Sequence, residues 1–572
     1  MTVSGPVGLV LGTSGHEATP LEFWVAVDPE RWLQLDDVVA LERTPPGGQT
    51  VRIFGVVAQV RARHEGARFD SDVFLIADGT LPAGVAEAAQ VLTTRVEPEV
   101  FVPPLPGQPV RLAEGEERLE ALFFDGMEAR VPAGTSRDGQ PVFVNREFLD
   151  GTRGAHVNIS GVSGVATKTS YATFLLHSLF TSGALPAAHN AKALIFNVKG
   201  EDLLFLDHAN TQLDDDDREQ YRALGLPATA FESVEFWAPP IRGATSGAPD
   251  TGSRKVGITA FHWSLAEFCT DELLPFLFTD AQDDRQQYTM VVHNVTARLR
   301  VDATPLPDGG VVIDGNEIRT FGTLVDVIGD RLEDEATMGE WAGRAIGAGT
   351  INAFLRRLHG AQKHVEHLVR GDLGTSGQIR RDKQITVVDI HNLNDRAKRF
   401  VVGVVLQRMF EQKEQAGTAD PRTFVVLDEL NKYAPREGHS PIKEILLDIA
   451  ERGRSLGIVL IGAQQTASEV ERRIIANSAI RVVGRLDAAE AGREEYGFLP
   501  AAHRQRATIL KPGAMIVSQP ELPVPLAILF PFPAWATRPA EAGAAPPPDE
   551  PAAALPADPF DAISTASTDA PF

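Results

Sequence analysis

The residues with the clearest chemical pattern form a loop between a strand-like run and an apolar-periodic helix. The loop reads GVSGVATKT over residues 161–169. A phosphate-binding loop needs backbone N–H groups and a helix N-terminus aimed at phosphate, a lysine that reaches the β- and γ-phosphates, and a hydroxyl for Mg²⁺. Lys168 and Thr169 have the side chains for the last two roles, and Thr169 is an expected Mg²⁺ ligand. The expected nucleotide-binding residues are Gly161, Gly164, Val165, Ala166, Thr167, Lys168, Thr169 and Ser170.

The spacing of this loop departs from the usual phosphate-binding pattern. Thr167 stands directly before Lys168, where the consensus has glycine, and Gly161 lies one residue too far upstream. An ordinary strand–turn–helix junction explains the segment as well as a phosphate-binding loop does. The nucleotide hypothesis therefore needs support from elsewhere in the chain.

That support comes from the run FVVLDE over residues 424–429, an apolar strand that ends in two carboxylates. Asp428 has the side chain to hold Mg²⁺, and Glu429 could orient or polarise an attacking water. The alternative is a buried strand that meets a charged turn. The run follows the loop in the order that a nucleotide site requires, which favours the chemical interpretation.

Three further polar residues flank the next strand. Gln464 follows the apolar run 458–461, at the carboxyl end where open α/β sheets bind ligands, so we expect it to sense the γ-phosphate; capping of the next helix is the alternative. Arg452 and Arg454 precede that run. If ATP lies between subunits, one of them, with Arg454 favoured, acts as an arginine finger on the neighbour. The alternative is a basic helix end that offsets the helix dipole.

The elements that must position these residues divide the chain into four parts. Residues 1–148 contain short β-branched or aromatic runs between turns, which predicts a small N-terminal β-barrel, with a strand at 73–76 and a helix at 83–92. Residues 149–200 and 381–536 alternate buried strands with helices, which predicts an α/β core interrupted by a mostly helical insertion over 201–380. Residues 537–572 are rich in Ala and Pro, and we expect them to be disordered.

Composition narrows the class of protein. The 572 residues include a single cysteine, Cys269, which excludes a disulfide framework and favours a reducing cytoplasm. No apolar run approaches the ~20 residues that cross a bilayer, so we expect a cytoplasmic protein without a membrane partner. The formal charge of −23 argues against a simple basic nucleic-acid binder. A ring, however, needs positive charge only along its channel.

Five segments together resemble the HerA family of the FtsK–HerA superfamily of P-loop ATPases. They are GAHVNISG (154–161), FNVKGE (196–201), LDELN (427–431), RGRSLG (452–457) and AQQ (463–465), in that order. Asn197 stands where the family more usually has an acid, and Asn477 sits where it often has asparagine.

The resemblance implies a RecA-like P-loop ATPase core behind a barrel. It also implies ATP and Mg²⁺ at the interfaces of a homo-hexamer, double-stranded DNA in the channel, and a NurA-type nuclease partner in DNA end resection and recombinational repair. Within that scheme Lys168, Thr169, Asp428 and Glu429 act in cis, Gln464 senses nucleotide, and Arg454 or Arg452 acts in trans.

Contacts with DNA are harder to place. The basic loops at 378–381 and 396–399 are candidates for phosphate contacts, with plain solvated surface as the alternative. His359, His364 and His367 share one probable helix, but no further ligand completes a zinc site, so we expect a polar face. Two other functions stay open: a related ATPase coupled to another effector, for example in anti-phage defence, and a nucleotide-gated scaffold with little turnover.

Overall fold

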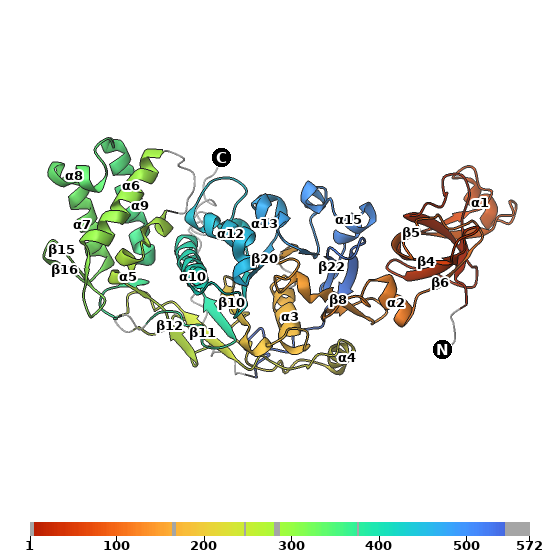
Figure 1. Ribbon diagram of the computed structural model, residues 1–572, viewed down its shortest axis with the longest axis horizontal. Helices are drawn as coiled ribbons and strands as arrows, with labels where there is room; N and C mark the ends of the chain where they lie inside the picture. The colour runs from red at the N-terminus through yellow and green to blue at the C-terminus, as the bar shows by residue number, and fades with distance from the viewer. Residues whose placement is uncertain (1–4, 163–167, 245–246, 279–285, 375–376, 544–572) are drawn as a thin grey trace, which may run out of the picture.

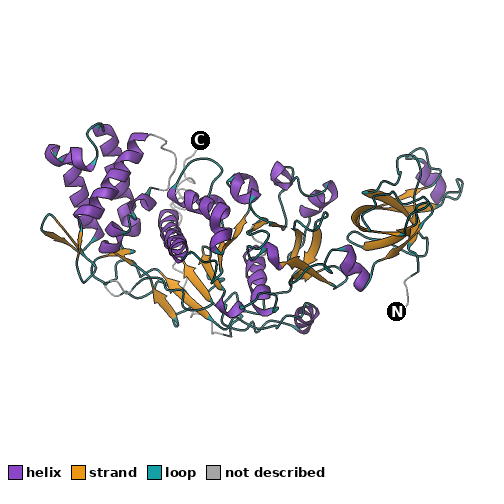
Figure 2. Cartoon of the chain, in the orientation of Figure 1, coloured by secondary structure: helices purple, strands orange, loops and turns teal. Residues whose placement is uncertain are grey.

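The computed structural model describes residues 5–162, 168–244, 247–278, 286–374 and 377–543. The molecule is elongated, with a β-barrel at one end, an α/β core in the middle and a helical lobe at the other end (Figure 1). Helices and strands alternate through the core, whereas the barrel is almost entirely strand and the lobe mostly helix (Figure 2).

The N-terminal barrel is closed and has its own core. Its strands follow the order β1-β2-β5-β4-β3-β6, and Phe23, Ile53 and Val91 are fully buried inside. This confirms the predicted barrel. The strands are β1 (Gly8–Val10), β2 (Glu22–Val27), β3 (Val38–Arg43), β4 (Val51–His64), β5 (Val85–Glu97) and β6 (Pro109–Leu112).

Two local predictions within the barrel are wrong. Strand β5 occupies the segment predicted as a helix, and the helix α1 (Asp72–Ala77) occupies the segment predicted as a strand. The alanine-rich β5 pairs with β2 on one side and β4 on the other, and Ala89 faces the core. Ladder hydrogen bonds and burial therefore outweigh the helix propensity of its alanines.

The last part of the range assigned to the barrel belongs to the core instead. Helix α2 (Glu116–Ala121) leads out of the barrel into the hairpin β7 (Arg130–Thr135) and β8 (Pro141–Asn145). Strand β7 pairs with β23 (Leu526–Leu529) at the edge of the central sheet. The barrel proper thus ends near residue 113, before the hairpin begins.

In the middle of the central sheet, six strands that are mutually parallel follow the order β18-β10-β19-β20-β9-β21. Their carboxyl ends consequently share one edge. The six are β9 (Val157–Ser160), β10 (Lys192–Asn197), β18 (Ile385–Asp389), β19 (Thr423–Leu427), β20 (Ile458–Gln464) and β21 (Ile480–Val483). The antiparallel strand β22 (Ala514–Ser518) joins β21 to β23.

Helices cover both faces of this sheet. Successive residues of a strand point to opposite faces, so Phe196 and Leu427 pack in the cluster that includes α10 (Asp395–Ala416) and α12 (Pro441–Arg452). Ile195 and Val426 pack in the other cluster, with α3 (Lys168–Thr181). This arrangement confirms the predicted α/β core.

The insertion is mostly helical, as predicted, but it also extends the sheet. Strands β11 (Val234–Ala238) and β12 (Ile258–Ala260) continue the parallel order beyond β18. The lobe contains α5 (Leu265–Thr270), α6 (Gln286–Asp302), α7 (Phe321–Glu333), α8 (Glu335–Trp341) and α9 (Ala348–Val365) with the short strands β13 (Trp263–Ser264), β14 (Thr304–Pro305), β15 (Val311–Ile313), β16 (Asn316–Ile318) and β17 (Val369–Arg370). Helix α4 (Asp215–Ala223) precedes β11.

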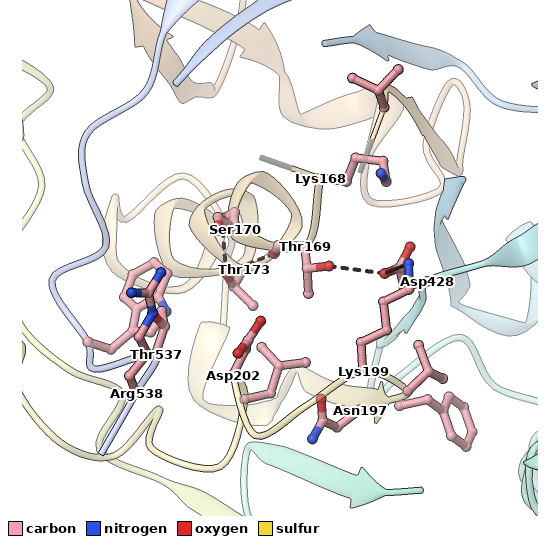
Figure 3. Close-up of a pocket in the computed structure, with 15 residues that line it drawn as sticks. Lys168, Thr169, Ser170, Thr173, Asn197, Lys199, Asp202, Asp428, Thr537 and Arg538 are labelled. Carbon is pink, nitrogen blue, oxygen red and sulfur yellow. Dashed lines mark hydrogen bonds and ion pairs between the residues drawn. The ribbon is translucent and has the colours of Figure 1, made fainter. Parts of the chain in front are cut away.

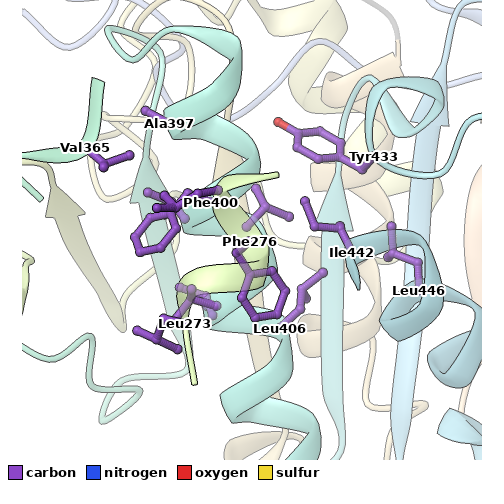
Figure 4. Packing of buried hydrophobic residues seen from close by; sticks show 14 of the residues in the cluster. Leu273, Phe276, Val365, Ala397, Phe400, Leu406, Tyr433, Ile442 and Leu446 are labelled. Carbon is purple, nitrogen blue, oxygen red and sulfur yellow. The ribbon is translucent and has the colours of Figure 1, made fainter. Parts of the chain in front are cut away.

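The lobe meets the core along α10 (Figure 4). Gly403 of α10 lets this helix approach Phe276 of the turn Leu274–Leu277 on one side and Ile442 of α12 on the other. A Cβ at Gly403 would lie 2.5 Å from Phe276 and 2.8 Å from Ile442, so the close approach requires glycine. One continuous apolar cluster therefore joins the lobe to the sheet.

Short elements complete the core: α11 (Leu430–Tyr433), α13 (Arg472–Ala476), α14 (Ala488–Ala491), α15 (Ala501–Ala507) and the 3₁₀ turns Arg146–Phe148, Ala188–Asn190, Gly453–Leu456, Ala467–Glu469 and Glu494–Tyr496. The sequence places the start of a disordered tail at 537, yet residues 537–543 are described and Glu541 is buried. In the described ranges, every helix is too short or too polar to span a bilayer.

Candidate nucleotide site

A pocket opens at the carboxyl edge of the parallel sheet, where the sequence predicts nucleotide binding (Figure 3). Lys168 and Thr169 reach it from the first turn of α3, Asp428 from the end of β19, and Lys199 from the turn after β10. The full lining is Val162, Lys168, Thr169, Ser170, Thr173, Phe196, Asn197, Val198, Lys199, Asp202, Leu203, Asp428, Trp535, Thr537 and Arg538.

The first turn of α3 brings a cation and a hydroxyl together at a helix N-terminus. The Lys168 ammonium donates a 2.7 Å hydrogen bond to the Gly161 carbonyl, and the Thr169 hydroxyl donates to Asp428 Oδ2 at 3.4 Å. Burial lowers the pKa of Lys168, and the positive charge of Lys199 adds to this while Asp428 and Glu429 oppose it. The positive end of the helix dipole and the lysine thus favour an anion at the same place.

Glu429 adopts an unusual backbone conformation directly after Asp428. Its φ of 56° lies in the left-handed region, which is uncommon for a residue other than glycine. Lys199 lies 3.0 Å from its carboxylate and Lys432 lies 2.9 Å away. Burial alone would raise the pKa of Glu429, but the hydrogen bonds from Lys432 and Lys199 outweigh it and hold this pKa below its ordinary value. The carboxyl group is therefore ionised at neutral pH.

Asn197 fixes the turn that carries Lys199. Its side-chain amide donates to the Gly200 carbonyl and to Asp389 Oδ1, both at 2.9 Å, and Asn197 is itself buried. Asp389 ends β18, the strand beside β10. The motif resemblance leads us to expect an acid at this position; here an amide bonded to a carboxylate ties the turn to the neighbouring strand.

Gln464 lies away from the pocket. It ends β20 and is fully buried, and its side-chain amide donates to Asn158 Oδ1 at 2.8 Å and to the Ser160 hydroxyl at 2.9 Å. These partners lie on β9, the strand that leads into the loop before Lys168. Although the sequence favours a side chain that points into the cleft, this one joins two strands beneath it.

Arg452 and Arg454 lie at the opposite edge of the sheet, before β20 begins. Arg454 donates to the carbonyls of Gly151 and Thr152 at 2.7 and 2.6 Å. Arg452 pairs with Glu414 at 2.8 Å. Neither lines the pocket of its own chain, so a contact with nucleotide requires a neighbouring subunit.

The other predicted loop residues divide into two groups. Ser170 lines the pocket, and the Gly161 amide donates to the Gln464 carbonyl at 3.1 Å, which anchors the start of the loop. Gly164, Val165, Ala166 and Thr167 lie outside the described residues.

Sequence reasoning missed four polar residues of the lining: Thr173, Asp202, Thr537 and Arg538. Lys199 lies within the run FNVKGE (196–201), and its place after a predicted strand at the carboxyl edge is a usable signal for a site residue. Thr537 and Arg538 offered none, because they begin the segment whose composition predicts disorder.

The oxygen donors of the pocket fit Mg²⁺. A threonine hydroxyl and an aspartate carboxylate, Thr169 and Asp428, are hard ligands of the kind that this ion takes when phosphate and water complete its shell. Across the described ranges no three or more His, Cys, Asp or Glu side chains group as a metal site, so a metal held by protein alone is not indicated there.

Comparison with known proteins gives distant structural likenesses. No family model and no curated protein matches the sequence. VirB4 of Thermoanaerobacter pseudethanolicus is 17% identical, with 70% of this chain and 96% of that chain covered and a TM-score of 0.44. The plasmid coupling protein TrwB in complex with ADP and Mg²⁺ is 12% identical, with 73% and 95% covered and a TM-score of 0.45.

A smaller match is the genome packaging NTPase B204 from Sulfolobus turreted icosahedral virus 2 in complex with ATP-gammaS. It is 14% identical, with 26% of this chain and 70% of that chain covered and a TM-score of 0.21. Likenesses this distant assign no family, so the function of the chain is inferred from the geometry of its own pocket.

Proposed function

We propose that this chain is an ATPase that hydrolyses ATP with Mg²⁺ and uses the energy to move DNA, as a member of the FtsK–HerA superfamily. One observation carries the ATPase proposal: Lys168 and Thr169 line one pocket with Asp428, which is 259 residues after Thr169, at the carboxyl edge of a parallel sheet. That is where open α/β sheets bind ligands.

Four side chains of the pocket and the neighbouring Glu429 have roles in this chemistry. Lys168 and the start of α3 bind the β- and γ-phosphates, and Thr169 and Asp428 hold Mg²⁺. Bound Mg²⁺ would offset the phosphate charge. The ionised Glu429 carboxylate orients the attacking water and accepts its proton. Lys199 keeps the two acidic side chains in place.

Assembly of subunits into a ring would supply the arginine finger. Arg454 lies at the amino edge, so a ring that sets this edge against a neighbour's pocket would bring an arginine to that γ-phosphate. A homo-hexamer with ATP between subunits is the assembly that the motif resemblance implies. In that assembly the role of Gln464 is indirect. Its hydrogen bonds join β20 to β9, the strand that leads to Lys168.

Double-stranded DNA in the channel of the ring is the proposed substrate of the motor, and a NurA-type nuclease that resects DNA ends in recombinational repair is its proposed partner. The order of the five motifs and the N-terminal barrel support this proposal. Such a motor would act in the cytoplasm.

The two candidate DNA loops lie at opposite edges of the sheet. Residues 378–381 precede β18, whereas 396–399 form the first turn of α10 at the carboxyl edge, where Lys398 donates to the Val198 carbonyl at 3.0 Å. Because the two loops lie on different sides of the core, their contributions to DNA binding can be measured separately. Arg380→Ala and Arg399→Ala should therefore differ in their effect on DNA binding, and the weaker binder identifies the channel-facing edge.

The test of the motor is ATP turnover by the purified full chain with and without linear duplex DNA. We expect stimulation by duplex DNA that falls steeply as salt rises from 50 to 200 mM, because phosphate contacts release counterions. Turnover that is equal with and without DNA, at both salt concentrations and with a NurA-type nuclease present, would indicate an ATPase that does not act on DNA. Proteins that co-purify with the assembled ATPase would then identify another effector.

A nucleotide-gated scaffold is the second candidate. The observation that favours it is the double ion pair on Glu429, since Lys199 and Lys432 both hold the carboxylate that would have to orient water. ATP binding with undetectable turnover, even with duplex DNA and a partner present, would support the scaffold over the motor.

A further inference from the structure

The segment that follows β23 packs against α3, the helix that begins at Lys168. Trp535 is fully buried against His177 of α3, at 5.2 Å between ring centroids, and it bridges to Ala209. The Tyr221 hydroxyl donates to the Phe532 carbonyl at 3.1 Å. A ring contact thus holds the segment against α3, and hydrogen bonds hold it against α4 and the loop before α4.

A buried carboxylate then shapes the turn that reaches the pocket. Glu541 is 3% exposed and accepts hydrogen bonds from the Thr537 amide and hydroxyl at 2.7 and 2.9 Å. Its carbonyl accepts from the Thr211 amide and hydroxyl at 2.8 and 2.7 Å. The turn 537–541 is therefore built by specific bonds, and it presents Thr537 and Arg538 to the pocket.

The pocket has two chemically different ends. Lys168, Thr169 and Asp428 make one end, and Thr537 and Arg538 make the other, with Asp202 between them (Figure 3). The first end has the cation, the hydroxyl and the helix N-terminus that phosphates need. The second has a mostly exposed guanidinium, whose side chain is 70% accessible, beside a carboxylate and the edge of a buried indole.

We propose that the second end binds the nucleoside: Arg538 stacks on the base and the Asp202 carboxylate accepts hydrogen bonds from the ribose hydroxyls. The inference rests on the proposed function, because it takes Lys168 to mark the phosphate end. A guanidinium plane stacks on any base, so this site recognises a ribonucleotide and discriminates little between ATP and GTP. An acidic side chain is a usual partner of ribose hydroxyls.

Calorimetric titration of the full chain with Mg·ADP and with Mg·tripolyphosphate separates the two ends of the pocket. Arg538→Ala should weaken ADP binding about tenfold, within the range for base stacking, and change tripolyphosphate binding less than twofold. Arg222→Ala is the matched control, because Arg222 also pairs with a glutamate three residues away on the surface but does not line the pocket. It should leave both ligands unchanged. Arg538→Gln serves if the alanine variant does not fold.

The ribose contact has its own test. Wild type should prefer ADP over 2′,3′-dideoxy-ADP by about tenfold, the effect of one or two hydrogen bonds to a charged group. Asp202→Ala should remove that preference without weakening tripolyphosphate binding, and the exposed control Asp216→Ala should keep it. Preservation of the preference in Asp202→Ala would overturn the ribose contact.

Failure of this inference differs from failure of the proposed function. If Arg538→Ala weakens neither ligand, or weakens ADP and tripolyphosphate equally, the nucleoside assignment is overturned while nucleotide binding stands. If wild type binds neither ADP nor tripolyphosphate, the nucleotide site itself is lost, and the nucleoside end with it.

Discussion

The Lys199 ammonium lies 3.0 Å from Glu429 and 3.5 Å from Asp428, so one cation contacts both carboxylates at the end of β19. Two adjacent carboxylates repel each other, and a shared lysine offsets that repulsion. The turn that carries Lys199 is itself fixed by the buried Asn197. Asn197 of β10, through the turn that carries Lys199, therefore helps to set the positions of Asp428 and Glu429, the proposed metal ligand and the proposed water-orienting group.

Replacement of Lys199 tests this arrangement. We expect Lys199→Met to lower kcat at least tenfold, because Glu429 would be held by Lys432 alone, while the affinity for Mg·ADP changes less. Lys199→Arg should recover part of the loss, since it restores the charge. The measurements are steady-state turnover and ADP titration on the same preparations. An unchanged kcat in Lys199→Met would show that the shared cation has no part in turnover.

The trans role of Arg454 can be tested by mixing variants. Arg454→Ala and Glu429→Gln should each be inactive alone, whereas mixed rings should regain turnover, because a cis site from the first can be completed by Arg454 of the second. Lys168→Ala mixed with Glu429→Gln is the control, since every cis site in that ring is defective. Absence of recovery in the first mixture, with rings formed, would place Arg454 outside the reaction.

Gly403 should be intolerant of a side chain. A Cβ would lie 2.5 Å from Phe276 and 2.8 Å from Ile442, so Gly403→Ala should lower the free energy of unfolding by about 1–3 kcal/mol despite the better helix propensity of alanine. Gly349→Ala on α9, where a Cβ meets open space, should be neutral or stabilising. Thermal unfolding measured by calorimetry compares the two variants. Equal melting temperatures would contradict the close packing of α10.

His156 predicts a pH dependence of stability. Its buried ring accepts a 2.9 Å bond from the Leu460 amide, and burial lowers its pKa to about 4. The folded state keeps the ring neutral while the unfolded chain binds a proton below about pH 6.5, so stability falls as pH falls from 6.5 towards 4.

For this one group the loss between pH 7 and pH 5 is about 2 kcal/mol. Denaturant unfolding of wild type and His156→Gln at both pH values measures it, since the variant lacks the titrating ring. His177 and His367 have similarly lowered pKa values and remain in both proteins, so the difference isolates His156. Parallel losses in the two proteins would contradict the assignment.

The phosphate end of the pocket was predictable from local pattern. An apolar run followed by polar residues marks the carboxyl end of a buried strand, and parallel strands share that edge, so Lys168 and Asp428 were expected to meet. The roles within β20 were less predictable. Gln464 ends its strand as expected. Whether its amide faces the cleft or the Asn158 side chain depends on which strand lies beside β20, and the residues of β20 alone do not determine that.

The nucleoside end and the barrel illustrate what sequence alone does not carry. Composition predicts disorder from residue 537, yet Glu541 is buried and its carbonyl accepts a hydrogen bond from Thr211, which is distant in sequence. Similarly, β5 reads as a helix by its alanines and becomes a strand through pairing with β2 and β4. In each case long-range contacts decide against the local preference.

The most direct test of the central claim, that Lys168, Asp428 and Glu429 serve one nucleotide, is a parallel measurement of ATP binding and turnover in three proteins of equal purity. Wild type should bind and hydrolyse ATP, Glu429→Gln should bind ATP with turnover reduced at least a hundredfold, and Lys168→Ala should bind it poorly or not at all. Equal turnover in wild type and Glu429→Gln, or full binding by Lys168→Ala, would contradict the claim.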